Sequence, residues 1–176
     1  IPGSIGGGLK MNSGCFGSEF KDHLVSLQCI DTKGNIKVFP SKNIKFKYRG
    51  IGLDEDLIFL SATFKGSLSE KEKINNLMQE LSNKKNNSQP SRIKTGGSTF
   101  KNPINQTNKK AWELIKESVP SNISFGDACI SNKHSNFFVN KNNATFNQMS
   151  NLINYVKEKV KSNTGIDIDL EIKVVK

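Results

Sequence analysis

The chain has 176 residues, an apolar content of 35% with 8% aromatic residues, and a formal net charge of +10. This length suits one domain, or one domain and part of another, and the apolar content excludes an intrinsically disordered chain. No uninterrupted apolar run reaches membrane-spanning length, and the lysines are scattered among Asn, Ser and Glu. We therefore expect a soluble protein with local anion recognition, rather than a membrane protein or a dedicated nucleic-acid binder.

The cysteines exclude two common kinds of site. Cys15, Cys29 and Cys129 are odd in number and widely spaced, so they fit neither a disulfide framework nor a zinc site. No metal site is expected, and a reducing compartment, the cytoplasm, is predicted. Because the chain starts at Ile1, already inside a Gly-rich motif and without an initiator methionine, we also expect it to be a fragment that lacks its N-terminal portion.

The opening residues 1–17 read IPGSIGGGLKMNSGCFG. Closely spaced glycines allow successive backbone N–H groups to approach a phosphate or a flat heteroaromatic ring. The alternative interpretation is a flexible linker, but apolar residues such as Ile5 and Leu9 are more frequent here than in typical linkers. The spacing differs from the dinucleotide-binding fingerprint, and no strand precedes it.

The next part of the chain shows β signals. Four apolar-rich or alternating runs predict short strands at residues 24–30, 36–39, 44–49 and 57–64. The polar residues 31–35 supply the turn between the first two. Arg49 would then lie at the end of a strand, from which a guanidinium can point into a cleft. The alternative is an exposed, salt-bridging arginine.

A helix is predicted after Gly66. Ser69 can cap it, and the apolar residues Ile74, Leu77, Met78 and Leu81 recur at helical spacing and predict a packing face. Residues 83–92 are polar and basic, which predicts a flexible segment leading to the next motif.

Residues 96–103, GGSTFKNP, combine two glycines, two hydroxyls, a lysine and an asparagine. Glycine allows a sharp turn and a close approach to a ligand, while Pro103 ends regular pairing. A hydroxyl, a cation and an amide within one turn suit an anionic, oxygen-rich ligand. On composition alone, an ordinary surface loop is the alternative.

The last third alternates between helix and strand signals. Residues 110–116 predict a helix that buries Trp112 and Ile115, whereas residues 119–136 look irregular. The remaining predicted elements are a buried strand at 137–139, a helix with a Thr145–Gln148 capping box that ends at Gly165, and a half-buried strand at 166–175.

Several motifs, in this order, resemble one known family. They are IPGSIGGGLKMNSG (1–14), KYR (47–49), GGSTFKNP (96–103), AWELI (111–115), SNKHSNFFVN (131–140), NNAT (142–145) and LEIKVV (170–175). Together they make nearly the whole chain similar to the UDP-N-acetylenolpyruvoylglucosamine reductase (MurB) family, flavoproteins of peptidoglycan precursor synthesis. A lid insertion found in one branch has no counterpart here, so the chain looks like the compact branch.

The resemblance implies a reaction and its catalytic residues. NADPH reduces FAD, which reduces the enolpyruvyl group of UDP-N-acetylglucosamine enolpyruvate to give UDP-N-acetylmuramate. Ser98 matches the proton donor, and Arg49 with Glu171 matches the pair that stabilises the enol-like intermediate. A permanently cationic guanidinium suits the charge that develops on the carboxylate. The ionisation of Glu171 stays open at this point.

The resemblance also implies an α+β fold and two parts. Residues 1–66 would be the second half of a two-part FAD-binding domain (VAO/PCMH-type), and residues 67–176 the UDP-sugar domain. The missing first half carries another Gly-rich loop in the family, so this fragment alone is expected to be inactive. The expected cofactor-binding residues are Ile1, Pro2, Gly3, Ser4, Ile5, Gly6, Gly7, Asn12 and Gly14, and the expected substrate-binding residues are Tyr48, Lys101 and Asn102.

The sequence departs from the family pattern in three places. Residues 50–52 (GIG) replace a polar stretch, residues 117–124 replace a glycine-containing turn, and Asp127 stands where glycine is usual. Two other functions remain open: a different FAD-dependent oxidoreductase of the same fold, or a basic module that binds nucleic acid or another anion.

Overall fold

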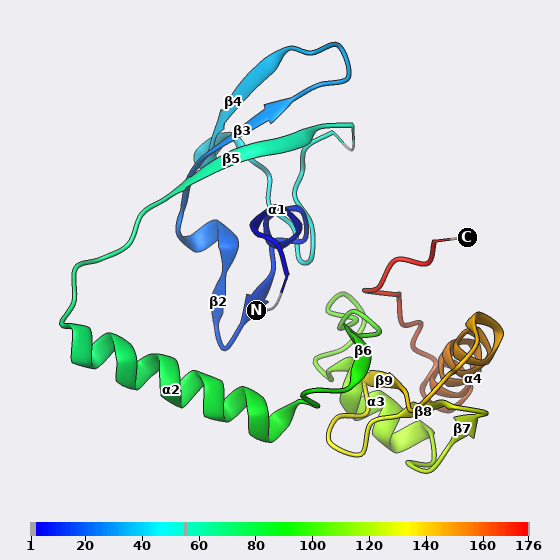
Figure 1. The fold of residues 1–176 in the computed structure, drawn as a ribbon. Coiled ribbons are helices and arrows are strands. Elements are labelled where there is room, and N and C mark those ends of the chain that lie inside the picture. Colours follow the sequence, from blue (N-terminus) through cyan, green and yellow to red (C-terminus); the bar gives the residue numbers. More distant parts are fainter. Residues whose placement is uncertain (1–2, 55, 176) are drawn as a thin grey trace. The chain divides into compact units, whose positions relative to one another are not determined.

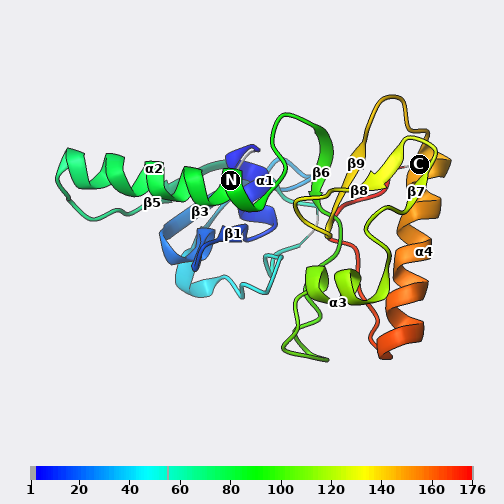
Figure 2. The ribbon, with the colours of Figure 1, turned by 90° about the horizontal axis from the view of Figure 1, so that it is seen from below.

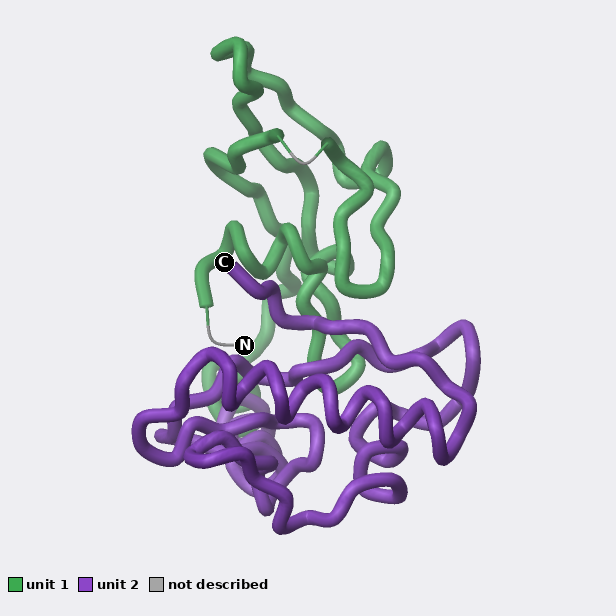
Figure 3. Tube along the Cα trace, turned by 90° about the vertical axis from the view of Figure 1, so that its right-hand side faces the viewer, with its two compact units in different colours: residues 1–76 green, residues 77–176 purple. Residues whose placement is uncertain are grey.

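The computed structural model describes residues 3–54 and 56–175. The chain divides into two compact units, unit 1 (Ile1–Asn76) and unit 2 (Leu77–Lys176), which are coloured separately in Figure 3. Helix α2 (Lys71–Ser88) contains the boundary between them. The functional boundary expected between residues 66 and 67 stays a prediction.

Unit 1 is built on a three-stranded antiparallel sheet (Figure 1). Its order is β4-β3-β5, and its strands are β3 (Leu24–Ile30), β4 (Ile36–Pro40) and β5 (Ile58–Phe64). The other elements are helix α1 (Ile5–Lys10), the hairpin strands β1 (Gly14–Cys15) and β2 (Ser18–Glu19), and the 3-10 turns η1 (Phe20–Asp22) and η2 (Ser41–Asn43). Three of the four predicted strands are thus confirmed.

The predicted turn between β3 and β4 is confirmed, and hydrogen bonds to the Asp31 side chain stabilise it. The Asp31 carboxylate accepts hydrogen bonds from the backbone N–H groups of Lys33 (3.0 Å) and Asn35 (2.9 Å). Gly34 adopts the left-handed conformation with φ 85°. The hydrogen bond from Asn35, joined by those from the Lys37 side chain and Lys33, lowers the pKa of Asp31 to about 2.

The core of unit 1 lies between α1 and the sheet. Leu9, Leu24, Leu27, Cys29 and Ile44 are buried there. Gly8 is required where α1 meets η1, because a Cβ added to it would lie 2.4 Å from the Phe20 ring carbon Cζ. The helix therefore packs on the aromatic ring through bare backbone.

The strand predicted at residues 44–49 is wrong. The chain forms one isolated bridge, between Lys47 and Gly50, and Arg49 lies in the turn with φ 54°. The chain doubles back so tightly that a Cβ on Gly52 would lie 2.3 Å from the carbonyl oxygen of Lys45. The glycines at 50 and 52 permit this reversal, which overrides the short alternating pattern before them.

Helix α2 is confirmed, but its predicted packing face is wrong. Ile74, Leu77 and Met78 are exposed, and no described residue of α2 is buried. The helix runs from one unit to the other, and neither buried core includes any of its residues. It also extends to Ser88, so the first part of the segment predicted to be flexible, residues 83–88, is helical.

Unit 2 is an antiparallel sheet packed against two helices (Figure 2). The sheet has the order β6-β9-β8-β7, with β6 (Lys94–Ser98), β7 (Ser124–Phe125), β8 (Ala128–Ile130) and β9 (Phe137–Asn140). Helices α3 (Ala111–Ser118) and α4 (Phe146–Thr164) bury Leu114, Ile115, Leu152, Val156 and Val160 in the core. Trp112, expected to be buried with Ile115, is half-buried.

The ends of α4 are as predicted. Gln148 N–H donates to Thr145 Oγ1 (3.2 Å), and Thr145 N–H donates to Gln148 Oε1 (3.0 Å), which completes the capping box. Gly165 ends the helix with φ 71°. Phe146, the first residue of this helix, is exposed, whereas the apolar residues Leu152, Ile153, Val156 and Val160 further along it are buried.

Two other predictions in unit 2 need correction. Within residues 119–136 the short strands β7 and β8 form a hairpin, which Gly126 allows with φ 58°. Residues 166–175 form a single bridge, Phe100 to Leu170, in place of the predicted strand. The segment that contains Phe100 has an irregular backbone at Gly97, where φ is 85°. Regular strand pairing with residues 166–175 therefore does not extend beyond the bridge.

Candidate functional site

Ser98 is the last residue of β6, directly before two buried residues. It pairs with Phe137 of β9, and Thr99 and Phe100 after it are 2% and 1% exposed. The Phe100 ring packs edge-on against Phe138, with the ring centres 5.8 Å apart. Burial of the residues that follow fixes the backbone next to the half-buried Ser98.

Glu171 is held against the same segment. Its N–H donates to the carbonyl oxygen of Thr99 (2.8 Å), and Lys101 N–H donates to the carbonyl oxygen of Asp169 (2.8 Å). Ile172, next to Glu171, lies against Gly96, where an added Cβ would be 3.4 Å from its Cγ2. The structure therefore places the backbone of Glu171 beside that of residues 98–100, and the catalytic pairing of Ser98 with Glu171 stays a prediction.

Asn136 holds this segment from the other side. Its side chain accepts a hydrogen bond from Phe100 N–H (2.9 Å) and donates one to the Phe100 carbonyl oxygen (2.8 Å). Its own carbonyl oxygen accepts from Thr99 N–H (2.8 Å), and the residue is 4% exposed. Asn136 belongs to a motif noted in the sequence, but nothing in the pattern indicated that its amide would take the place of a strand partner.

His134 supports Asn136. Its ring packs against Phe137 (4.8 Å between ring centres) and lies near Trp112 (6.2 Å). Burial lowers the pKa of His134, which favours the neutral ring. Asn136 N–H donates to its Nδ1 (3.2 Å), so the ring proton resides on Nε2.

The two substrate-binding residues expected in unit 2 follow this segment. The Asn102 side-chain oxygen accepts a hydrogen bond from Ala111 N–H (3.0 Å), which ties it to the start of α3. Lys101 is half-buried and anchored through its backbone. Their contacts with a substrate stay predictions.

In unit 1, Tyr48 and Arg49 form the tip of a tight turn. Lys47 and Gly50 exchange backbone hydrogen bonds at its base (3.0 and 3.2 Å). The Arg49 guanidinium lies 4.9 Å from the centre of the Tyr48 ring and donates from Nη2 to the carbonyl oxygen of Gly14 (3.3 Å). A cation–π contact and a backbone acceptor thus restrain the guanidinium.

The Gly-rich opening is partly helical. Ser4 caps α1, because its hydroxyl oxygen accepts from Gly7 N–H (3.1 Å). Among the residues that the structure describes, none lies within 4 Å of a Cβ added to Gly3 or Gly6, and Ile5 is 58% exposed. Two of the expected cofactor-binding residues, Ile1 and Pro2, lie outside the described part of the chain.

The other two expected cofactor-binding residues are engaged within the protein. Asn12 is fully buried, and its side chain bonds to Glu19, to the Lys47 carbonyl oxygen and to Lys21 N–H. Gly14 pairs with Glu19 in the β1–β2 hairpin. The site residues therefore form two groups: Tyr48 and Arg49 with the Gly-rich opening in unit 1, and Ser98 with Glu171 in unit 2. That the two groups share one site stays a prediction.

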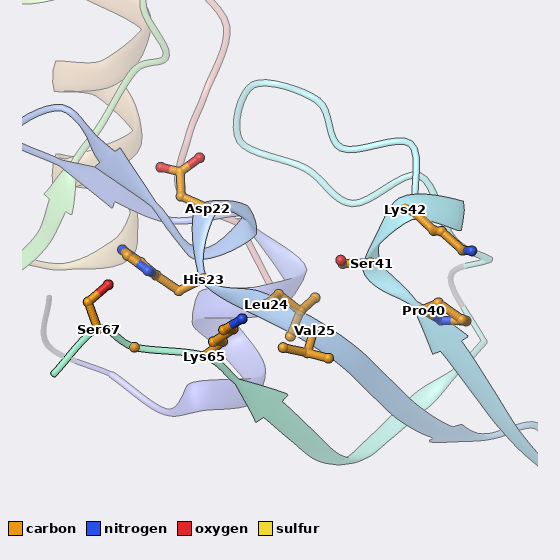
Figure 4. Close-up of a pocket in the computed structure, with 10 residues that line it drawn as sticks. Asp22, His23, Leu24, Val25, Pro40, Ser41, Lys42, Lys65 and Ser67 are labelled. Carbon is orange, nitrogen blue, oxygen red and sulfur yellow. The ribbon is translucent and has the colours of Figure 1, made fainter.

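Unit 1 also contains an open pocket of about 580 Å³, which Figure 4 shows in close-up. Its lining includes His23, Lys42, Lys65 and Ser67, and none of the predicted site residues.

In the described part of the chain, no helix has the length and apolar character needed to cross a membrane. The same residues contain no group of three or more His, Cys, Asp or Glu side chains that could hold a metal ion.

The sequence of the chain is similar to those of known proteins. Residues 89–175 match the family model of the UDP-N-acetylenolpyruvoylglucosamine reductase C-terminal domain. The chain is 61% identical over its whole length to a UDP-N-acetylenolpyruvoylglucosamine reductase from Pelagibacter ubique (strain HTCC1062), covering 58% of that protein. It is 44% identical over 98% of its length to one from Rickettsia bellii (strain RML369-C), covering 56% of that relative.

A solved structure agrees. The crystal structure of UDP-N-acetylenolpyruvylglucosamine reductase (MurB) from Thermus caldophilus superimposes with a TM-score of 0.84 at 31% identity, over 98% of this chain and 60% of the other. The chain thus spans between half and two thirds of the length of the relatives it matches. These matches confirm the α+β fold, and the chain belongs to the UDP-N-acetylenolpyruvoylglucosamine reductase (MurB) family.

Proposed function

We propose that this chain provides the substrate domain and part of the flavin domain of an enzyme that reduces UDP-N-acetylglucosamine enolpyruvate to UDP-N-acetylmuramate, with NADPH as the reductant, in the cytoplasm. Residues 1–66 would contribute to flavin binding and residues 67–176 to substrate binding. The observation that carries the proposal is the pairing of the Ser98 segment with Glu171, through Thr99, inside the region that matches the reductase C-terminal domain.

The side chains suit the reaction. Reduction of the enolpyruvyl double bond places negative charge on its carboxylate and α-carbon. The Arg49 guanidinium would stabilise that charge as it develops. Ser98 would then transfer its hydroxyl proton to the α-carbon, because a strongly basic enolate can deprotonate a serine held within reach. Glu171, beside Ser98, would act with Arg49 to stabilise the enol-like intermediate.

The residues at the Gly-rich opening fit a flavin. The open space beside Gly3 and Gly6 allows a flat ring or a phosphate to approach the backbone, and the exposed Ile5 offers an apolar contact. When bound, FAD would supply the hydride, after reduction by NADPH. Gly3, Ser4, Ile5, Gly6 and Gly7 would hold it, and Asn12 and Gly14 would support the loop behind them.

Substrate recognition would use the remaining predicted residues. Lys101 offers a charge to the diphosphate of the UDP-sugar, and Asn102 offers an amide beside it. Tyr48, which already contacts the Arg49 guanidinium, would contact the substrate from unit 1.

Two glycine substitutions in α1 separate flavin contact from folding. Gly6→Ala should raise the free energy of unfolding by about 0.5 kcal/mol, because alanine favours helix and no described residue lies within 4 Å of its Cβ. It should nevertheless weaken FAD binding by about tenfold, since the methyl group fills the open space. Gly8→Ala should instead lower the free energy of unfolding by about 1–3 kcal/mol, because its Cβ overlaps the Phe20 ring.

Urea denaturation and titration of FAD into the full-length apoprotein, followed by flavin fluorescence, would measure both effects. Unchanged FAD affinity in the Gly6→Ala variant would contradict a flavin at this face of α1.

The function itself is tested by turnover. The FAD-loaded full-length protein should consume NADPH when UDP-N-acetylglucosamine enolpyruvate is added, with formation of UDP-N-acetylmuramate. UDP-N-acetylglucosamine, which lacks the enolpyruvyl group, is the control and should give no consumption above background. Equal NADPH consumption with both compounds, or none with either, would refute the proposal.

A further inference from the structure

Glu19, at the end of β2, has no predicted role, but it lies at the centre of a polar network in unit 1. It pairs with Gly14 across the β1–β2 hairpin. A Cβ added to Gly14 would lie 2.6 Å from Glu19 Cγ, so the glutamate side chain passes directly over the glycine. Glycine at position 14 therefore makes room for Glu19.

Asn12 connects Glu19 to the turn that carries Arg49. Its Nδ2 donates to Glu19 Oε2 (3.0 Å) and, with a longer contact of 3.4 Å, to the carbonyl oxygen of Lys47. Its Oδ1 accepts from Lys21 N–H (3.1 Å), and the residue is fully buried with φ 40°. A buried amide in a left-handed backbone conformation, with both ends bonded, fixes the distance between the segments it joins.

The two segments held by this network are the ones that fix Arg49. Lys47 is the base of the tight turn, and the carbonyl oxygen of Gly14 accepts a hydrogen bond from Arg49 Nη2 (3.3 Å). Arg49 itself has φ 54°, a conformation that a non-glycine residue adopts only when its surroundings impose it.

Glu19 is also the anion of the network. Lys21 Nζ lies 2.8 Å from its Oε2. The hydrogen bond from Lys21 is the main cause that lowers the pKa of Glu19, and Asn12 and the charge of Arg49 act in the same direction. The carboxylate is thus ionised at neutral pH and close enough to the guanidinium to interact with its charge.

We propose that Glu19 is a positioning residue for Arg49, acting through Asn12 on the Lys47–Gly50 turn and through Gly14 on the guanidinium. This inference rests on the proposed role of Arg49 in charge stabilisation. Glu19 itself touches no reacting atom; its removal changes where the guanidinium lies and leaves the proton donor in place.

A double-mutant cycle tests the coupling. Glu19→Gln keeps the size of the side chain and removes its charge. In the FAD-loaded full-length protein, it should slow oxidation of the reduced flavin by substrate about tenfold and leave reduction by NADPH unchanged. In an Arg49→Ala background, the same substitution should change the oxidation rate by less than about twofold, because the group that it positions is gone.

Glu80→Gln is the matched control. Glu80 is likewise a carboxylate bonded to a lysine, Lys84, and its pKa is likewise lowered, but it is exposed on α2. This variant should match the unmodified protein in both half-reactions. Glu19→Asp keeps the charge and so favours folding. Its rate of flavin oxidation should lie between those of Glu19→Gln and the unmodified protein, since its shorter side chain reaches Asn12 less well.

The outcomes are distinguishable. A tenfold loss from Glu19→Gln that persists in the Arg49→Ala background would overturn the positioning role, as would full activity of Glu19→Gln. If Arg49→Ala alone leaves flavin oxidation unchanged, the proposed function of Arg49 fails, and the inference about Glu19 fails with it.

Discussion

Replacing Ser98 by alanine should slow oxidation of the reduced flavin by substrate about a hundredfold or more in the full-length protein, because the reaction would lose the proton donor that we propose. Reduction of the flavin by NADPH should proceed at the unmodified rate, since that step needs no proton from Ser98. Stopped-flow absorbance of the flavin separates the two half-reactions. Substrate affinity should change little, because alanine removes a single hydroxyl.

Ser162→Ala is the control, because Ser162 is an exposed serine on α4 whose hydroxyl donates to the Lys159 carbonyl oxygen. It should leave both half-reactions unchanged. If Ser98→Ala slows both half-reactions to the same extent, Ser98 is not the proton donor, and the loss reflects a general disturbance of the site.

Replacing Asn136 by alanine should lower the free energy of unfolding of unit 2 by about 2–4 kcal/mol, because it leaves both the N–H and the C=O of the buried Phe100 without their partner. The same change frees the backbone next to Ser98, so the remaining folded protein should also oxidise reduced flavin more slowly. Urea denaturation followed by the fluorescence of Trp112, which lies in unit 2, would measure the stability change.

The matched control is Asn105→Ala, at an exposed asparagine between Pro103 and α3. It should change the free energy of unfolding by less than about 0.5 kcal/mol. Equal stability of the two variants would show that the Asn136 amide does not hold the Phe100 backbone.

Elements with strong local signals could be predicted from the sequence. Helix α4 has an apolar stripe, a capping box and a terminal glycine, and the structure contains all three. The strands β3 and β4 followed from two apolar runs around a polar turn that Asp31 organises. In such cases the local hydrogen bonds and the buried face favour the same conformation, so the pattern is sufficient.

The failures occur where long-range packing or glycine geometry decides the conformation. Residues 166–175 alternate as strictly as any strand, but pairing is limited to one bridge beside the irregular Gly97. The alternation at 44–49 was likewise overridden by the reversal at Gly50 and Gly52. Alternation reports which side chains can be buried, whereas a strand also needs an available partner edge.

The candidate site shows the same division. Ser98 and Glu171 could be named from motifs, and the structure places them on neighbouring segments of unit 2, because Glu171 N–H donates to the carbonyl oxygen of Thr99. That their side chains act in one site stays a prediction. Asn136 could not be assigned from the sequence, because its amide bonds to the backbone of Phe100, 36 residues earlier in the chain. The network around Glu19 could not be assigned either, because Asn12 joins that carboxylate to the carbonyl oxygen of Lys47, 35 residues after Asn12. Only folding reveals which carbonyl or N–H a buried polar side chain satisfies.

The central claim is that Arg49, Ser98 and Glu171 act on one substrate. The most direct measurement is a crystal structure of the full-length, FAD-loaded protein with UDP-N-acetylglucosamine enolpyruvate bound. We predict that the Arg49 guanidinium and the Ser98 hydroxyl both lie within about 3–4 Å of the enolpyruvyl group, with the Glu171 carboxyl next to it. A bound substrate whose enolpyruvyl group contacts Ser98 and Glu171 while Arg49 faces a different surface would contradict the claim.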